Sequence, residues 1–166
     1  MSTTTSPGVN TAFFELMRHP IKFRMFLLSK LPAAYFAGLR IEKADATTCV
    51  VSVPFKWFTQ NPFGSIYFAC LSMAAEMSTG ALAMAAIYKR PQKVSMLVVR
   101  SEAQFLKKAK GKIKFICNDG ATIAAAVEEA IQNGTSTVSI LSEGMNAEGE
   151  KVASFSFTWS FKAVAK

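Results

Sequence analysis

A long apolar segment in the middle of the chain restricts the possible folds more than any other feature. Between Lys56 and Lys89 the only charged residue is Glu76. The segment 65–88 is predicted to form one helix, which a basic pair and Pro91 end. A helix that is apolar on nearly all sides must be enclosed by other parts of the chain. The sequence therefore predicts a fold built around one buried central helix.

The main alternative for this segment is a transmembrane helix, because its length suffices to cross a bilayer. Against this alternative stands Glu76, whose charge near the helix centre would cost about 2.5–3.5 kcal/mol on insertion scales. The sequence on both sides is also rich in predicted strands. We therefore expect a core helix and no membrane span.

The segments around the central helix alternate mostly like strands. Phe155, Phe157, Trp159 and Phe161 are separated by Ser156, Thr158 and Ser160, a pattern typical of a half-buried strand. Before the central helix, residues 38–55 suggest two extended pieces joined by a turn at 44–47. After it, the predicted strands are 94–106, 112–117, 135–143 and 151–164, with a helix at 121–132.

The N-terminal part is predicted to be helical. Residues 10–31 space their apolar side chains at helical intervals, and His19-Pro20 marks a break between two short helices. We interpret His19 as a helix-end residue and not as a ligand. The predicted organisation is a helical extension, 1–37, followed by one domain, 38–166. The fold class is α+β, with a curved antiparallel sheet wrapped around the central helix.

The 166-residue chain has a formal net charge of +8, and the excess is local. Residues 89–114 hold nine cationic residues and only Glu102 as an acid. Such a concentration favours a phosphate-bearing partner, or it protects a strand edge against aggregation. Nucleic acid is disfavoured because Phe105 and Phe115, the aromatic residues of this region, are expected to face the core.

The three cysteines are scattered and lack the spacing of metal ligands, so we expect reduced thiols, no metal and a cytoplasmic location. The sequence MSTTTSPGVN has no basic region leading into an apolar one, so no secretory signal is expected.

Glu76 lies on a distinctive stripe of the predicted helix. Within about 60° of it, at 100° per residue, the residues are mostly small or hydroxylated. These neighbours are Ser65, Ala69, Ser72, Met73, Thr79, Gly80 and Ala83. A stripe of small side chains allows a partner subunit or a ligand to approach closely. A buried carboxylate is usually functional when it is retained, and the alternative is an ion pair with a basic residue.

One motif resembles that of hotdog-fold acyl-CoA thioesterases related to phenylacetyl-CoA and 4-hydroxybenzoyl-CoA thioesterases. The matching residues are Asn61, Gly64, Tyr67, Phe68-Ala69 and Glu76. The family pattern has Asn or Gln, then Gly, then His-Gly-Gly, and an acidic residue nine positions after the histidine. The segment FLKKAKGKIKF also resembles a strand-turn-strand of that family. The resemblance covers residues 40–164 and is greatest to an uncharacterised branch that lacks His-Gly-Gly.

This resemblance implies a hotdog fold and thioester hydrolysis. The backbone N–H of Phe68 would polarise the thioester carbonyl, Asn61 would hold the oxygen or the loop, and Glu76 would act as base or nucleophile. Thr79 would hold the water. Residues expected to line the substrate site are Gly64, Ala69, Ser72, Arg90, Lys107, Lys108 and Lys110, with the cationic ones meeting the phosphates of coenzyme A. No cofactor is expected beyond coenzyme A as part of the substrate.

Helix geometry bears on the assembly. Tyr67 and Glu76 are nine residues apart, about 13.5 Å along a helix and half a turn out of phase. They cannot share one site within one chain, whereas the related enzymes combine these two positions from two subunits. We therefore expect a homodimer with two composite sites, and tetramers remain open.

The departures from the family pattern leave alternatives. Phe68-Ala69 replaces two glycines that let a backbone approach its ligand. Tyr67 either donates a hydrogen bond in place of the histidine or is an amphipathic residue at a helix start. A hotdog protein that binds acyl-CoA or a fatty acyl group without turnover is therefore the second hypothesis, and a ligand-free structural dimer is the third.

Overall fold

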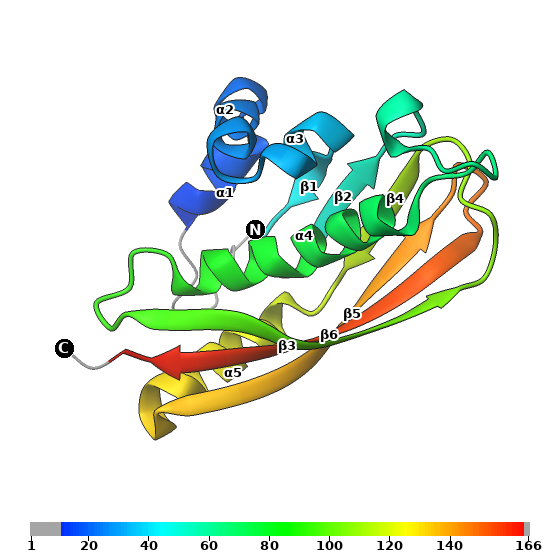
Figure 1. Cartoon of the computed structure of the whole chain (residues 1–166). Helices are drawn as coiled ribbons and strands as arrows, with labels where there is room; N and C mark the ends of the chain where they lie inside the picture. Colours follow the sequence, from blue (N-terminus) through cyan, green and yellow to red (C-terminus); the bar gives the residue numbers. More distant parts are fainter. Residues whose placement is uncertain (1–10, 165–166) are drawn as a thin grey trace, which may run out of the picture.

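The computed structural model describes residues 11–164 and contains five α-helices, one 3-10 helix and six strands within them. Figure 1 shows their arrangement. The helices are α1 (Thr11–Arg18), α2 (Pro20–Lys30), α3 (Pro32–Ala37), η1 (Trp57–Thr59), α4 (Phe68–Ile87) and α5 (Gly120–Asn133). The strands are β1 (Arg40–Ala44), β2 (Cys49–Val53), β3 (Val94–Phe105), β4 (Ile113–Cys117), β5 (Thr135–Met145) and β6 (Lys151–Ala163).

The six strands form one antiparallel sheet in the order β1-β2-β4-β5-β6-β3. The long helix α4 lies across one face of the sheet, and the N-terminal helices lie beside β1 at one edge. Strand β3 forms the opposite edge (Figure 1). This is the α+β fold that the sequence predicts, with a curved sheet around one apolar helix.

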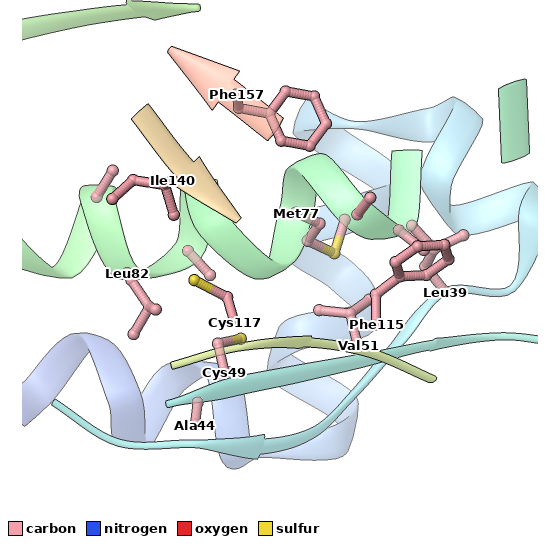
Figure 2. Packing of buried hydrophobic residues seen from close by; sticks show 14 of the residues in the cluster. Leu39, Ala44, Cys49, Val51, Met77, Leu82, Phe115, Cys117, Ile140 and Phe157 are labelled. Carbon is pink, nitrogen blue, oxygen red and sulfur yellow. The ribbon is translucent and has the colours of Figure 1, made fainter. Parts of the chain in front are cut away.

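The core fills the space between α4 and the sheet. Phe155, Phe157, Trp159 and Phe161 of β6 are all buried, which confirms the alternation seen in the sequence. Figure 2 shows Met77 and Leu82 of α4 among side chains from the strands. Thirteen of the twenty residues of α4 are buried, and many are alanine, so the helix can approach the sheet closely. By length and composition α4 could cross a membrane, but 72% of its most apolar window is buried inside the protein.

Helix α4 begins at Phe68, three residues later than predicted. Ser65 and Ile66 belong to the preceding loop. The N–H of Ile66 donates to the carbonyl of Ala109, and Ile66 forms an isolated antiparallel β-bridge with Gln60. This tertiary pairing fixes an extended backbone that helical periodicity alone does not reveal. Ser65 therefore does not lie on the Glu76 stripe of the helix.

The N-terminal helices confirm the break at His19-Pro20. His19 caps α2, and its Nδ1 accepts from the N–H of Lys22 at 3.4 Å. The third helix, α3, was not predicted; it runs from Pro32 to Ala37 and is capped by Gly38, which has a φ of +78°. Side chains from α1 and α2 join the same hydrophobic core as the sheet. The predicted boundary between the helical extension and the domain, between residues 37 and 38, falls at the end of α3. Residues 1–10 of the predicted extension lie outside the described part.

Candidate functional site

The loop that leads into α4 is organised by Asn61. Its side-chain Oδ1 accepts from the N–H groups of Phe63 and Ser65, and its Nδ2 donates to Ser65 Oγ at 3.0 Å. Gly64 has a φ of +70°, which favours glycine at this turn. Asn61 therefore holds the loop, one of the two roles expected for it, and its amide is already engaged.

The first turn of α4 presents two backbone donors without acceptors. Tyr67 is the N-cap residue, and its carbonyl accepts from Cys70 N–H and Leu71 N–H. Within residues 11–164 the N–H groups of Phe68 and Ala69 have no hydrogen-bond acceptor. A helix N-terminus carries partial positive charge, so these donors suit an oxygen that gains negative charge.

A cavity of about 510 Å³ lies in front of this helix end. Its walls combine aromatic, aliphatic and cationic side chains, including Asn61, Tyr67, Phe68, Phe105, Lys107 and Lys108. The rings form a chain in which Phe68 lies 5.0 Å from Tyr67 and 6.4 Å from Phe105, between ring centroids. Tyr67 and Phe68 are 46% and 56% exposed, so both rings form part of the surface of the cavity beside the helix end.

The predicted cationic residues do not all meet at this cavity. Lys107 lines it while pairing with Glu150 at 2.5 Å, and Lys108 donates to the carbonyl of Phe63 at 3.3 Å. Lys110 is exposed but does not line the cavity. Arg90 follows the opposite end of α4 and forms an ion pair with Glu128 at 2.7 Å. Within one chain, Arg90 is therefore not at the cavity mouth, because the length of α4 separates the two places.

Glu76 lies in the middle of α4, on the flank that faces the β6–β3 side of the sheet. Burial raises the pKa of its carboxyl group above the ordinary value. Its Oε1 lies 2.8 Å from the position that a Cβ on Gly80 would occupy, and the Trp159 indole approaches the same point to 3.4 Å. The Glu76 side chain has no hydrogen bond or ion pair to any residue between 11 and 164. The ion-pair alternative is thus not found within the described chain.

Thr79 does not have a hydroxyl free for water. It is fully buried, its Oγ1 donates to the carbonyl of Glu76 at 2.9 Å, and it accepts from Trp159 Nε1–H at 3.0 Å. This contact ties α4 to β6, which gives Thr79 a structural role in the single chain. The position of Trp159 beside Glu76 could not be predicted from the sequence, because only the strand register brings the two residues together.

One chain therefore builds only part of the predicted site. It brings Asn61, Tyr67, Phe68, Lys107 and Lys108 to one cavity, and Ala69 adds a backbone donor. Glu76 and Thr79 lie farther along the helix, and Ser72 is half-buried between them and the first turn. No group of three or more His, Cys, Asp or Glu residues that could hold a metal occurs among the described residues.

The edge strand β3 is exposed from residue 99 to residue 105. By register, Ser101, Ala103 and Phe105 lie opposite Phe157, Phe155 and Ala153, whose side chains are buried. These three β3 residues are nevertheless exposed. Trp159 pairs with Val98 of the same strand, so the Glu76 flank of α4 adjoins this open edge.

A family model describes the chain from residue 22 to residue 161 as a domain of unknown function, DUF4442. The chain belongs to this family. The match begins within α2 and reaches the last strand, so it includes the cavity, α4 and the β3 edge. No curated protein matches the chain.

Solved structures share the fold at low sequence identity. PA5026 of Pseudomonas aeruginosa, described as a protein of unknown function and "Probable Thioesterase", matches with a TM-score of 0.74 and 23% identity, covering 90% of this chain and 99% of its own. Thioesterase PA1618 of the same species matches with a TM-score of 0.67 and 15% sequence identity. The match covers 90% of this chain and 99% of the PA1618 chain. Thioesterase HI1161 of Haemophilus influenzae matches with a TM-score of 0.60 and 13% sequence identity. The match covers 88% of this chain and 92% of the HI1161 chain. The hotdog fold expected from the sequence is thus confirmed.

Proposed function

We propose that this protein hydrolyses acyl-CoA thioesters, with Glu76 as the base or nucleophile. The observation that carries the proposal is the half-buried Glu76 carboxylate, which has no partner in the described chain although its partial removal from water is costly for its charge. The free N–H groups at the start of the same helix support it, as do the thioesterase descriptions of the structurally similar proteins.

The active unit is a homodimer joined along β3. This strand is twelve residues long, lies at the sheet edge and leaves inward-facing side chains uncovered. Such an edge pairs readily with a second copy of itself. The dimer would place the Glu76 of one subunit near the start of α4 in the other subunit. Within one chain this is not achieved, because Glu76 lies too far along the same helix from its start. Pairing of dimers into a tetramer is a further possibility that solution measurements can decide.

In this composite site the thioester carbonyl oxygen accepts hydrogen bonds from the N–H groups of Phe68 and Ala69. The partner subunit's Glu76 removes a proton from water as the water oxygen attacks the carbonyl carbon. The tetrahedral oxyanion is stabilised by the two donors and the helix end. The C–S bond then breaks, and the thiolate of coenzyme A takes up the proton that Glu76 removed from water. Direct attack by the carboxylate would form an anhydride that water opens to the same products.

The cavity walls suit an apolar acyl group and an anionic coenzyme. Phe68, Leu71 and Phe105 supply apolar surface, and Lys107 and Lys108 supply positive charge beside it. Charge near the mouth attracts the phosphates of coenzyme A without contacting the reacting atoms. We expect these lysines to affect substrate binding more than turnover.

A second candidate function is the binding of acyl-CoA or a fatty acyl group without hydrolysis. It is favoured by the ring of Phe68, which stands at the helix end where the resembling thioesterases have a glycine, beside Tyr67 at the position of their histidine. Access of a carbonyl to the Phe68 and Ala69 donors decides between the two functions.

The test is the release of free thiol from short, medium, long and aromatic acyl-CoAs by the wild type, Glu76→Gln and Glu148→Gln. Glu148 is exposed in the β5–β6 turn, so its variant controls for the loss of one carboxylate. Loss of turnover in Glu76→Gln alone, by about a hundredfold or more, supports carboxylate-dependent hydrolysis. Saturable binding without turnover by the wild type would contradict it and leave the binding function.

A further inference from the structure

A second and larger cavity lies at the opposite edge of the sheet from β3. This groove has a volume of about 940 Å³ and runs between α2 and the β1 edge. Its walls come from α1, α2, α3, β1 and the segments around Pro54 and Lys112. None of its lining residues lines the cavity at the start of α4. The groove is therefore separate from the proposed thioesterase site.

One wall of the groove is apolar because α2 is apolar on two opposite faces. Phe23 and Leu27 are buried in the core. Ile21, Met25 and Leu28 form a second stripe at helical spacing, line the groove, and are 67%, 67% and 49% exposed. An exposed stripe of this kind is unfavourable in water unless it serves binding.

The rest of the groove is cationic. Arg24, Arg40 and Lys56 line it, and none of them has a carboxylate partner among residues 11–164. The Arg24 guanidinium lies 4.1 Å above the Tyr35 ring, and the Lys56 amine lies beside Gly38. Between Glu15 and Glu42 the sequence has five cationic residues and no acidic one.

The single carboxylate of the groove is already engaged. Glu42 accepts from Ser52 Oγ at 2.7 Å and from Lys112 at 3.3 Å, and the Ser52 hydrogen bond, followed by the lysines, lowers its pKa. Arg18 is also engaged, since its guanidinium donates to the carbonyl of Ala44. Arg24, Arg40 and Lys56 are left as the cations that can meet an anion.

We propose that the groove between α2 and β1 binds a long-chain carboxylate, with its chain along Ile21, Met25 and Leu28 and its carboxylate at Arg24, Arg40 and Lys56. An apolar wall and unpaired cations in one groove complement a ligand that has an apolar chain and one anionic end. The volume is in the range of pockets that hold such small molecules. The same chemistry occurs in a membrane lipid, but the concave shape favours a single chain that enters from solution.

The test is calorimetric titration of the full chain with dodecanoate below its micelle concentration, and with dodecyltrimethylammonium, which has the same chain length and the opposite charge. Two variants probe the groove: Arg40→Glu reverses a cation, and Met25→Asn interrupts the apolar stripe. Lys30→Glu is the matched control, because Lys30 lies on the same helix and does not line the groove. Thermal unfolding of each variant shows whether it is folded.

We expect saturable binding of dodecanoate and none of the cationic analogue. Arg40→Glu and Met25→Asn should each weaken binding by about tenfold or more, since each removes a charge-assisted contact or apolar contact area. Lys30→Glu should bind like the wild type. The expected result is independent of thioesterase activity, which all three variants should retain.

Three outcomes would overturn the proposal. The first is no saturable binding, or equal affinity in the wild type and both groove variants. The second is binding only to anionic phosphatidylglycerol vesicles in sedimentation, which would assign the surface to a membrane. The third is a change of oligomeric state in Met25→Asn during size-exclusion chromatography, which would assign the stripe to a second copy of the chain.

Discussion

The two edges of the sheet differ in how they are covered. At the β1 edge, helices of the same chain pack into the core, and the Arg18 guanidinium fixes them to the carbonyl of Ala44. At the β3 edge the strand is exposed from residue 99 to residue 105, and this exposed part includes Ala103 and Phe105 on the face that points toward the core. The difference shows that one edge is completed within the chain, while the other is suited to completion by a second chain.

The largest expected effect comes from a charge placed on the open edge. Ala103→Asp would bury a carboxylate in the proposed interface, where an unpaired charge is costly. We expect monomers in analytical ultracentrifugation and a loss of thioesterase activity of about a hundredfold or more, because both proposed composite sites depend on the dimer. Ala147→Asp, the same change in an exposed turn, is the control. A dimeric, active Ala103→Asp variant would show that β3 is not the interface.

A smaller loss is expected from Gly80→Ala, which tests whether the position of the Glu76 carboxylate matters. The new Cβ would lie 2.8 Å from Glu76 Oε1, so the flexible carboxylate must move. Alanine favours helix over glycine by about 1 kcal/mol, so the variant should be at least as stable as the wild type. Activity should fall about tenfold, since the proposed catalytic carboxylate of Glu76 is displaced by a short distance. Unchanged kcat would argue against a catalytic Glu76.

The raised pKa of Glu76 predicts opposite effects of pH on activity and stability. In the proposed mechanism the carboxylate form of Glu76 is the base, so the rate should increase with pH up to a pKa above that of ordinary glutamate. Protonated Glu76 fits the buried site better than ionised Glu76. Its contribution to stability is therefore complete below the unfolded-state pKa and is lost as pH rises through the folded-state pKa.

Glu76→Gln removes this titration. In urea unfolding, the free energy of unfolding of Glu76→Gln should exceed that of the wild type by an amount that increases with pH. The increase should occur between the unfolded-state and folded-state pKa of Glu76. Glu148→Gln should show no such change. An advantage that is constant with pH would mean that Glu76 is solvated in the folded protein.

Thr79→Val tests the internal tie between α4 and β6. It leaves the Trp159 Nε1–H buried without an acceptor, which should cost about 1–3 kcal/mol in denaturant unfolding. Thr79→Ser keeps the hydroxyl and should recover most of that stability. If Thr79→Val instead keeps its stability and loses turnover, the residue holds water, as the family resemblance implies.

The smallest effect is expected from Lys108→Ala at the mouth of the cavity. Its contact to the Phe63 carbonyl is exposed, and a solvated charge contributes about 1 kcal/mol or less. We expect KM for acyl-CoA to rise a few-fold with unchanged kcat, and the increase should shrink at high salt. A large fall in kcat would place Lys108 among the groups that contact the reacting atoms.

Much of the fold could be predicted because its signals are local. The alternation of Phe155, Phe157, Trp159 and Phe161 defines a strand, and the uncharged run around Glu76 defines the central helix. The short helix at Pro32–Ala37 was missed because six residues that begin with a proline and precede a glycine carry little periodicity. The start of α4 was placed too early because the pairing of Ile66 with Ala109 depends on a distant segment.

The candidate site was predictable only where its residues are close in sequence. Asn61, Gly64, Tyr67 and Phe68 meet because the loop and the first helical turn are continuous. Arg90 was grouped with the lysines by charge, but twenty residues of helix separate it from the cavity. The groove beside β1 could not be predicted, because it requires α2 to pack against the sheet with its second apolar face outward.

The sequence by itself determined that the central helix would carry a single carboxylate, since no other charge occurs between Lys56 and Lys89. It also determined the order of helix and strands, because side-chain periodicity is a local property. The tertiary structure decided which groups surround that carboxylate and which edge of the sheet remains open. Those outcomes depend on strand register and packing, which join residues such as Thr79 and Trp159 across eighty positions of the chain.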